Sequence, residues 1–334
     1  MYPIVYSTDE KYLPFVSVSI QSIIANNDTN EHFKIFIFYD EISELQQKKV
    51  LSMQTPNIEI AFIDVKKHLN FDLNLLKTCF HYTKEMYYRF LIPYLFEEFE
   101  KILYVDCDLI FNINPKIYFD INIGKNCLGA INDVGILNTK LKYHEYVKSL
   151  GVVPEKYFNS GVLVMNIKEL IKIKLYEKFV EKIKEERTYL FPDQDLLNII
   201  CKDKICYLDY AYNFQWVVYL DKPPIENFSN EMLYQNYMAS ATSPYIVHFA
   251  AGKKPWKNPE LPMSEYFWKY ARLSPYYEEI LTNSIIQKTS QMEKFNLFDY
   301  YKYKIKSKIP NKKQAHYKQK YKQVKTILQQ RGII

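Results

Sequence analysis

The stretch Lys101-Ile-Leu-Tyr-Val-Asp-Cys-Asp-Leu-Ile-Phe111 decides the fold that this sequence predicts. Its apolar part, residues 102–105, is short and β-prone, which is typical of a buried strand in a sheet covered on both faces. Two carboxylates, Asp106 and Asp108, follow that strand. Ligands of open α/β sheets bind beyond the carboxyl ends of the strands, and paired carboxylates suit Mg²⁺ or Mn²⁺. The stretch therefore predicts a metal-binding edge of an α/β sheet.

An Asp-x-Asp pattern is not specific by itself. The chain has 15 Asp among 334 residues, so roughly one such pattern is expected by chance. Two occur, the second being Asp193-Gln-Asp195. The position of Asp106 carries more weight, because a purely structural carboxylate has little reason to follow four apolar residues.

The composition describes an ordinary globular protein, with 48% hydrophobic and 25% charged residues. Its 7 Gly form neither a Gly-x-Gly-x-x-Gly nor a Gly-Lys-Ser/Thr loop, so dinucleotide-binding and P-loop proteins lose their main sequence support. The 5 Cys include no Cys-x-x-Cys pair, which fits a reducing, cytoplasmic compartment better than a disulfide framework or a zinc ribbon. We expect neither a signal peptide nor a membrane span.

The formal net charge of +6 is unevenly distributed. Residues 288–334 contain 12 Lys and 1 Arg against two acids, a net charge of +11, which leaves −5 on residues 1–287. We therefore divide the chain into a main domain at 1–282 and a basic, partly helical C-terminal tail at 283–334. Such a tail predicts peripheral attachment to an anionic surface, the inner face of the cytoplasmic membrane. The alternative is a solvated tail without a partner.

Strand-like and helix-like segments alternate along the chain. Strands are predicted at 4–9, 33–39, 58–63, 102–105, 127–131, 158–166, 205–208 and 245–249, and helices at 12–25, 43–53, 83–96, 167–187, 196–200 and 264–282. Loops are predicted at 134–157 and 209–243, and a loop or short helices at 64–82. This alternation predicts an α/β fold with a mainly parallel central sheet.

Polar residues follow or begin several of these strands. They are Asp9, Asp106, Asp108, Asp133, Asn159 and His248. This pattern predicts a single pocket along the carboxyl edge of the sheet.

Two of the polar segments also have a structural interpretation. His248 follows apolar residues, where a histidine is usually a hydrogen-bonded core residue, although Lys253 and Lys254 nearby favour a site for a metal and a diphosphate. The two lysines alone can also form a solvated turn. One acid of Asp193-Gln-Asp195 can cap the apolar helix that follows it. A cap does not explain the glutamine between the two acids.

Six segments together resemble glycosyltransferase family 8, the retaining nucleotide-sugar transferases that include bacterial lipooligosaccharide galactosyltransferases and glycogenin. In the order of the family, they are Ile4-Val-Tyr-Ser-Thr-Asp-Glu-Lys-Tyr12, Tyr88-Arg-Phe90, Tyr104-Val-Asp-Cys-Asp108, Phe158-Asn-Ser-Gly161, Asp193-Gln-Asp195 and His248-Phe-Ala-Ala-Gly-Lys-Lys-Pro-Trp256. They span about three quarters of the chain. Each segment is weak alone, and their common order makes the resemblance strong.

The resemblance implies a GT-A catalytic domain, a UDP-sugar donor and a bound Mn²⁺, with Mg²⁺ as the alternative ion. It implies that Asp106, Asp108 and His248 bind the metal. It also implies that Asp193 and Gln194 are catalytic. The residues that it places around the UDP-sugar are Ser7, Asp9, Lys11, Arg89, Asp106, Asp133, Asn159, Ser160, Asp193, Gln194 and Lys254. One departure is that the family usually has Gly three residues after the histidine, where this chain has Ala251 and then Gly252.

We therefore expect a retaining hexosyltransferase that moves glucose or galactose from a UDP-sugar to a glycan or glycolipid hydroxyl. The expected pathway is the synthesis of bacterial cell-surface polysaccharide or lipooligosaccharide. A metal-dependent phosphohydrolase is one alternative, but it leaves Asp193-Gln-Asp195 unexplained. A non-catalytic nucleic-acid-binding protein is another, but only the tail is basic, so we expect no nucleic-acid partner.

Overall fold

The structure of the chain is a computed structural model. It describes residues 1–69, 71, 73–77, 83–138, 143–185, 187–216, 219, 231–293, 297–310, 313–330 and 332–333. Two compact units are present: Met1–Pro255 with Glu260–Tyr277 form the first, and Trp256–Pro259 with Glu278–Ile334 form the second. All predicted site residues belong to the first unit. The predicted division of the chain at residue 282 stays a prediction.

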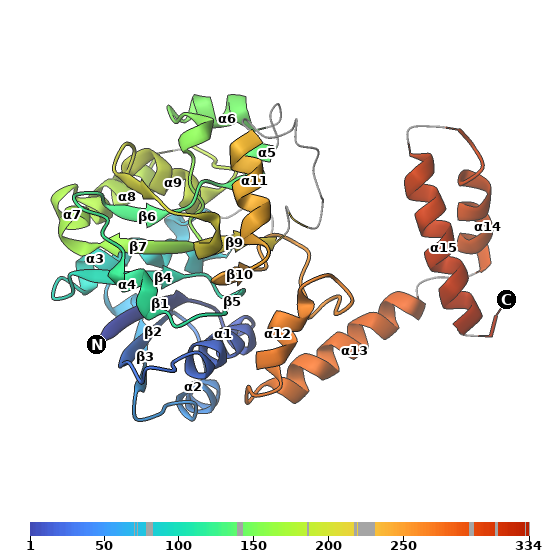
Figure 1. Cartoon of the computed structure of the whole chain (residues 1–334), viewed down its shortest axis with the longest axis horizontal. Helices are drawn as coiled ribbons and strands as arrows, with labels where there is room; N and C mark the ends of the chain where they lie inside the picture. Colours follow the sequence, from blue (N-terminus) through green and yellow to red (C-terminus); the bar gives the residue numbers. More distant parts are fainter. Residues whose placement is uncertain are drawn as a thin grey trace. The chain divides into compact units, whose positions relative to one another are not determined.

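A sheet of seven strands lies at the centre of the first unit (Figure 1), in the order β3-β2-β1-β4-β7-β6-β8. The strands are β1 (Tyr2–Ser7), β2 (Phe33–Tyr39), β3 (Ile58–Asp64), β4 (Lys101–Val105), β6 (Leu128–Ala130), β7 (Val162–Asn166) and β8 (Ile205–Tyr207). Neighbours are parallel except that β7 is antiparallel to both β4 and β6. The predicted α/β fold with a mainly parallel sheet is therefore confirmed.

Three short strands form a second sheet in the order β5-β10-β9. They are β5 (Leu109–Phe111), β9 (Phe214–Gln215) and β10 (Ile246–His248). β10 pairs antiparallel with β5 and parallel with β9, and His248 is the partner of Leu109. This small sheet brings the Asp-x-Asp stretch next to segments that lie far away in the sequence.

The helices of the first unit are short. The α-helices are α1 (Leu13–Ala25), α2 (Glu44–Leu51), α3 (Ile92–Leu95), α4 (Lys116–Asp120), α5 (Val134–Asn138), α6 (His144–Ser149), α7 (Ile167–Lys172), α8 (Leu175–Ile183), α9 (Pro192–Ile200), α11 (Glu231–Ser240) and α12 (Ser264–Ala271), and the 3₁₀ helices are η1 (Val65–Lys67), η2 (Leu73–Leu75), η3 (Lys84–Leu91), η4 (Pro154–Lys156) and η5 (Tyr210–Asn213).

Several predicted boundaries were wrong. The helix predicted at 167–187 is two helices, α7 and α8, because Lys174 between them takes the left-handed conformation with φ 57°. The helix predicted at 83–96 is the 3₁₀ helix η3, which continues as α3 with Pro93 in its first turn. The strand predicted at 158–166 begins only at Val162.

Two predicted loops contain regular structure. The loop predicted at 134–157 includes α5, α6 and η4. The loop predicted at 209–243 includes η5, β9 and α11, and its residues 217, 218 and 220–230 lie outside the described residues. The segment 64–82, predicted as a loop or short helices, includes the short helices η1 and η2 and lies partly outside the described residues.

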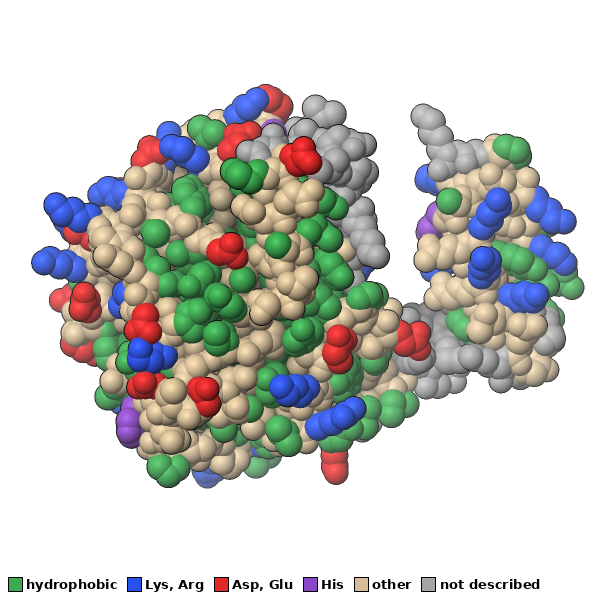
Figure 2. Space-filling view, viewed as in Figure 1, with side chains coloured by type: hydrophobic (Ala, Val, Ile, Leu, Met, Phe, Trp, Pro, Cys, Tyr) green, Lys and Arg blue, Asp and Glu red, His purple; other side chains and the backbone are tan. Residues whose placement is uncertain are grey.

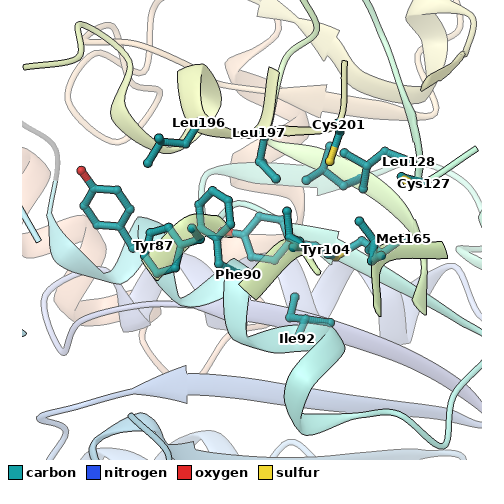
Figure 3. Close-up of a cluster of buried hydrophobic side chains, with 14 of the residues drawn as sticks. Tyr87, Phe90, Ile92, Tyr104, Cys127, Leu128, Met165, Leu196, Leu197 and Cys201 are labelled. Atoms are coloured by element: carbon teal, nitrogen blue, oxygen red, sulfur yellow. The ribbon is translucent and has the colours of Figure 1, made fainter. Parts of the chain in front are cut away.

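A large cluster of buried apolar side chains joins η3 and α9 to β4 of the central sheet. Figure 3 shows Leu196 and Leu197 of α9 close to Phe90 of η3 and Tyr104 of β4, all of them buried. The rings of Phe90 and Phe179 stack with their centroids 4.2 Å apart. Because interiors are close-packed, this cluster fixes η3 and α9 against β4, and polar residues on both helices acquire fixed positions.

The second unit contains α13 (Tyr277–Glu293), α14 (Leu297–Lys306) and α15 (Gln314–Gln330), with α13 beginning at the last residue of the first unit. α14 and α15 pack side by side through the ring pairs Tyr300–Tyr321 and Tyr303–Tyr317. Figure 2 shows Lys side chains and apolar side chains together on the face of this unit that is turned to the viewer. Among the described residues, no helix combines the length and the apolar character needed to cross a membrane.

Candidate active site

Two strands bring the Asp-x-Asp pair and the histidine together. Asp106 follows β4, and its backbone N–H donates to the carbonyl oxygen of Gly161 at 2.8 Å. Asp108 precedes β5, and its carbonyl oxygen accepts from the N–H of Phe249 at 2.9 Å. Since His248 directly precedes Phe249, the pairing of β5 with β10 holds Asp108 beside His248.

Asp106, Asp108 and His248 form a cluster whose candidate ligand atoms all lie within 4.8 Å of one another. His248 Nε2 lies 3.2 Å from an Asp108 oxygen and 3.8 Å from an Asp106 oxygen. Carboxylates suit Mg²⁺ and Mn²⁺, and an imidazole is a good ligand for transition metals. The donor set therefore fits a divalent ion such as Mn²⁺.

Because Gly161 has no side chain, this cluster can occupy the space beside its Cα atom. A Cβ atom at position 161 would lie 2.3 Å from His248 Cε1 and 2.8 Å from an Asp106 oxygen. Real Cβ atoms essentially never approach other atoms so closely. Only glycine therefore permits the imidazole and the carboxylate to lie against the start of β7.

Each of the two carboxylates has a buried cation beside it. Arg89 Nη2 is 2.9 Å from an oxygen of Asp106, and Lys254 forms an ion pair with Asp108. Burial would raise the pKa of Asp108, but the charge of Lys254 is the main influence that holds that pKa well below its ordinary value. Asp108 is therefore ionised at neutral pH, as a metal ligand must be.

Five predicted donor-site residues form one buried hydrogen-bond network; they are Asp133, Asn159, Ser160, Asp193 and Gln194. Asn159 Nδ2 donates to a carboxylate oxygen of Asp133 at 3.0 Å and to Gln194 Oε1 at 3.1 Å. Gln194 Nε2 donates to the same Asp133 oxygen at 3.1 Å. Ser160 Oγ donates to Asp193 at 2.9 Å. The network fixes the orientation of both side-chain amides.

Arg89 connects this network to the metal cluster. Its Nη1 lies 2.9 Å from Asp193 and donates to the carbonyl oxygen of Ser160 at 2.7 Å, while its Nη2 donates to Asp106. Its guanidinium carbon lies 4.2 Å from the centre of the Tyr104 ring. Burial raises the pKa of Asp193, and the charge of Arg89 opposes that rise. Arg89 thus compensates the buried Asp193 and the partly exposed Asp106 at once.

Asp195 has a different environment from Asp193. Its carboxylate accepts from the hydroxyls of Tyr146 and Tyr157 and, at 3.0 Å, from the N–H of Phe191 at the start of α9. The predicted cap was wrong, because Phe191 is the N-cap of α9 and both acids lie inside the helix, with Asp195 in its first turn. The side chain of Asp195 satisfies a backbone donor that the first turn of a helix leaves free.

Asp195 should make stability depend on pH. Burial raises its pKa to about 6 in the native state, against about 3.9 in an unfolded chain. The native state then binds the proton more tightly, so the stabilisation is complete below pH ~4 and is lost as the pH rises to ~6. We expect the wild type to lose about 3 kcal/mol at most relative to Asp195→Asn across this window. Urea unfolding at several pH values measures the difference, and a constant difference would contradict the prediction.

Three of the residues that the resemblance places around the UDP-sugar, Ser7, Asp9 and Lys11, lie at or just after the end of β1. Asp9 Oδ1 accepts from the N–H of Tyr12 at 2.8 Å, Lys11 is exposed, and the buried hydroxyl of Ser7 has no hydrogen-bond partner. Within the described part of the chain, no hydrogen bond or ion pair joins these three side chains to the metal cluster. Burial raises the pKa of Tyr12, and the charges of Asp108 and Asp9 add to that rise.

The sequence interpretation missed Asn213 and Gln215. Asn213 Oδ1 is 2.9 Å from His248 Nδ1, and Gln215 Nε2 donates to Asp133 at 3.3 Å. The available signal was the alternation of polar and aromatic residues at 212–216, which is the period of a strand. It was overlooked because it lies in a region interpreted as a loop.

Comparisons with known proteins agree with this arrangement. The model of the family described as glycosyl transferase family 8 matches residues 3–260. General stress protein A of Bacillus subtilis (strain 168) is 27% identical over 278 residues, which cover 80% of this chain and 92% of that protein. A lipopolysaccharide 1,2-glucosyltransferase of Escherichia coli is 26% identical over 319 residues, which cover 89% of this chain and 85% of that protein.

Two solved structures have a similar fold. The apo structure of the WbbM bifunctional glycosyltransferase has a TM-score of 0.75 at 23% identity, covering 85% of this chain and 52% of that chain. This chain therefore spans about half of the length of that protein. The galactosyltransferase LgtC, solved with donor and acceptor sugar analogues, has a TM-score of 0.66 at 23% identity, covering 81% of this chain and 96% of that chain.

Proposed function

Because this chain belongs to glycosyltransferase family 8, we propose that it moves a hexose from a UDP-sugar to a glycan hydroxyl, with a divalent metal ion and with retention of the anomeric configuration. The predicted GT-A fold is confirmed by the fold of the two solved transferases. The names of the similar proteins report glucose and galactose as transferred sugars and lipopolysaccharide as an acceptor. For this chain, we propose glucose or galactose and an acceptor of the cell-surface glycan class.

One observation carries the proposal: the cluster of Asp106, Asp108 and His248 lies next to the buried amide network around Gln194. These three residues would hold Mn²⁺ or Mg²⁺, and the bound ion supplies positive charge for a diphosphate leaving group. Lys254 adds a positive charge on the same side, since it lies against Asp108. A phosphohydrolase would need the metal and the lysine but not the amide network, so the network favours sugar transfer.

Asp193 and Gln194 are proposed to hold the reacting sugar. Gln194 has no ionisable group, and the Asp193 carboxylate already interacts with Ser160 and Arg89. Neither side chain therefore resembles a free nucleophile. This supports a same-face reaction in which the leaving phosphate accepts the proton of the acceptor hydroxyl. The network around Asp133 and Asn159 would orient the sugar during that step.

The uracil is proposed to bind at the end of β1. The hydroxyl of Ser7 is buried without a hydrogen-bond partner, and a buried polar group in that state is a good position for a ligand contact. Asp9 is only partly buried, and Lys11 is exposed. These observations support the role that the family resemblance implies for the three residues.

Measuring the melting temperature with UDP-glucose and UDP-galactose, each with and without Mn²⁺, tests the proposal. A ligand that binds the native state raises the melting temperature, so we expect an increase only when the nucleotide sugar and the ion are both present. Hydrolysis of p-nitrophenyl phosphate without any response to UDP-sugars would support a phosphohydrolase instead. Salt-dependent RNA binding without affinity for UDP would support the nucleic-acid-binding class.

Gln194→Ala should lower kcat far more than it weakens UDP binding. The amide lies in the proposed sugar site, away from the proposed uracil site, so we expect a loss of about 100-fold in kcat. If α9 needs Gln194 only for its structure, the substitution should cost about 1 kcal/mol of stability and little activity. Turnover and melting temperature of the same variant separate the two outcomes. Asn198→Ala, a buried residue of the same helix, is the matched control.

We propose that an exposed apolar face of α14, in the second unit, attaches the protein to a membrane. Phe298, Tyr301 and Ile305 are 72%, 55% and 61% exposed. Their spacing of three and four residues places them on one face of α14. Lysines surround them in sequence, and an apolar stripe with cationic neighbours is typical of a helix that lies on an anionic membrane. The second unit would bring the enzyme to a lipid-linked acceptor.

A chain that ends at Glu293 should lose binding to vesicles rich in phosphatidylserine but keep transfer to a soluble acceptor. Each basic residue near such a surface contributes about 1 kcal/mol, and salt weakens the attraction. The full-length variant Phe298→Ser/Ile305→Ser keeps every charge and should bind several-fold more weakly. Leu45→Ser, which removes an apolar residue 75% exposed on the first unit, is the control. Equal sedimentation of all four proteins at low salt would disprove membrane attachment.

A further inference from the structure

A chain of side-chain amides connects the backbone at the start of β7 to the imidazole of His248. The N–H of Gly161 donates to Asn159 Oδ1 at 3.0 Å. Asn213 Nδ2 donates to the same oxygen at 2.9 Å, and Asn213 Oδ1 is 2.9 Å from His248 Nδ1. All of these groups are buried, with Asn213 only 1% exposed.

The backbone N–H of Gly161 determines the donor and the acceptor of each hydrogen bond in the series from Gly161 to His248. A backbone N–H can only donate, so the Asn159 atom that meets Gly161 must be the oxygen. The other atom of the Asn159 amide is consistent with this assignment, because Nδ2 donates to the carboxylate of Asp133. Asn213 must then present its NH₂ group to Asn159, and its oxygen remains for His248. An oxygen without a hydrogen requires that His248 Nδ1 carries the proton.

The consequence concerns the other nitrogen of the same ring. With the proton on Nδ1, the neutral imidazole presents a lone pair at Nε2, the atom that faces Asp106 and Asp108. A metal-binding nitrogen must be unprotonated, and the partner of the other nitrogen decides which one that is. The position of Asn213 in the fold agrees with this role. Asn213 directly precedes β9, and β9 pairs with β10, the strand that ends at His248.

We propose that Asn213 is a positioning residue that fixes the tautomer and the ring orientation of His248 for metal binding. The inference rests on the metal site of the proposed function. Partners of metal-binding histidines typically change metal affinity by about 10- to 100-fold when they are replaced. Asn213→Leu removes both hydrogen bonds and keeps a side chain branched at Cγ, so we expect a loss of Mn²⁺ affinity of that size.

The first experiment measures Mn²⁺ affinity by calorimetry, without any sugar substrate. Asn198→Leu is the matched control, because Asn198 is equally buried but, among the described residues, hydrogen-bonds only to the backbone of Phe158 and Gln194. It should lower the melting temperature and leave Mn²⁺ affinity within about twofold of wild type. Asn213→Asp keeps an acceptor for His248 Nδ1 but loses the donor to Asn159 Oδ1, so it should recover part of the affinity that Asn213→Leu loses.

The second experiment observes the tautomer directly. The chain has only 6 His, so ¹⁵N-histidine labelling of the Mg²⁺-loaded protein should resolve His248, and we expect its proton on Nδ1. A proton on Nε2 in the loaded wild type, or equal Mn²⁺ affinity of Asn213→Leu and wild type, would overturn the inference. If wild type binds no divalent ion at all, the proposed metal site itself is wrong. Should Asn213→Leu fail to fold, the wild-type spectrum still decides.

Discussion

Asp108→Asn is expected to lower kcat/KM for sugar transfer by about 1,000-fold or more, which corresponds to about 4 kcal/mol. The side chain keeps its volume but loses the negative charge that a divalent ion requires. Asp108 also lies at the centre of the cluster, 3.2 Å from His248 Nε2 and in an ion pair with Lys254. One substitution therefore changes the metal ligand and the environment of a buried cation.

Steady-state kinetics with a UDP-hexose at varied Mn²⁺ measures this effect. Asp120→Asn is the control, because it also replaces an Asp by Asn but changes an exposed ion pair with Lys116, so activity should stay within about twofold of wild type. Calorimetric melting establishes that Asp108→Asn is folded. A folded variant with more than a tenth of wild-type activity at ordinary Mn²⁺ would contradict the role of Asp108.

Arg89→Met should reduce the free energy of unfolding by about 3–5 kcal/mol and abolish transfer as well. The guanidinium is 3% exposed and lies 2.9 Å from both Asp106 and Asp193. Removing it leaves Asp193 buried without its cation, and an uncompensated buried charge is among the costliest changes in a protein interior. Methionine retains most of the apolar stem, so the lost packing is small.

Urea unfolding of Arg89→Met, Asp193→Asn and the double variant measures the coupling between the two charges. We expect the double variant to be more stable than the sum of the single effects, since neither charge remains unpaired in it. Arg187→Met is the control, because Arg187 is exposed and its substitution should change stability by less than about 0.5 kcal/mol. Strictly additive effects would mean that the ion pair contributes nothing.

The sequence predicted the parts of the fold that local periodicity determines. The strand expected at 33–39 is β2 residue for residue, because it is almost continuously apolar and buried on both faces. The helix expected at 167–187 failed at Lys174, since its left-handed conformation leaves no trace in the apolar pattern. The apolar periodicity shows which face of a helix is buried, but it does not show whether the helix continues without a break.

The candidate site could be predicted where polar residues follow apolar strands, as at Asp106 and His248. The orientation of β7 was not predictable in this way. Because β7 is antiparallel to β4, residues that precede it, such as Asn159 and Ser160, reach the same edge as residues that follow β4. Asn213 was missed for a related reason: β9 has only two residues, and its partner β10 lies far along the chain. Strands as short as β9 form because they pair with a neighbouring strand, and the intrinsic β-propensity of their residues does not reveal them.

The pairing of β5 with β10 has a consequence for synthesis on the ribosome. Asp106 and Asp108 emerge long before His248 and Lys254, so a nascent chain that has not yet reached β10 carries two of the three proposed ligands and lacks the lysine. Such a nascent chain has the two acids but not the complete set of proposed metal ligands. Tight Mn²⁺ binding would then begin only when translation has passed β10, and premature chains would neither retain the ion nor consume nucleotide sugar.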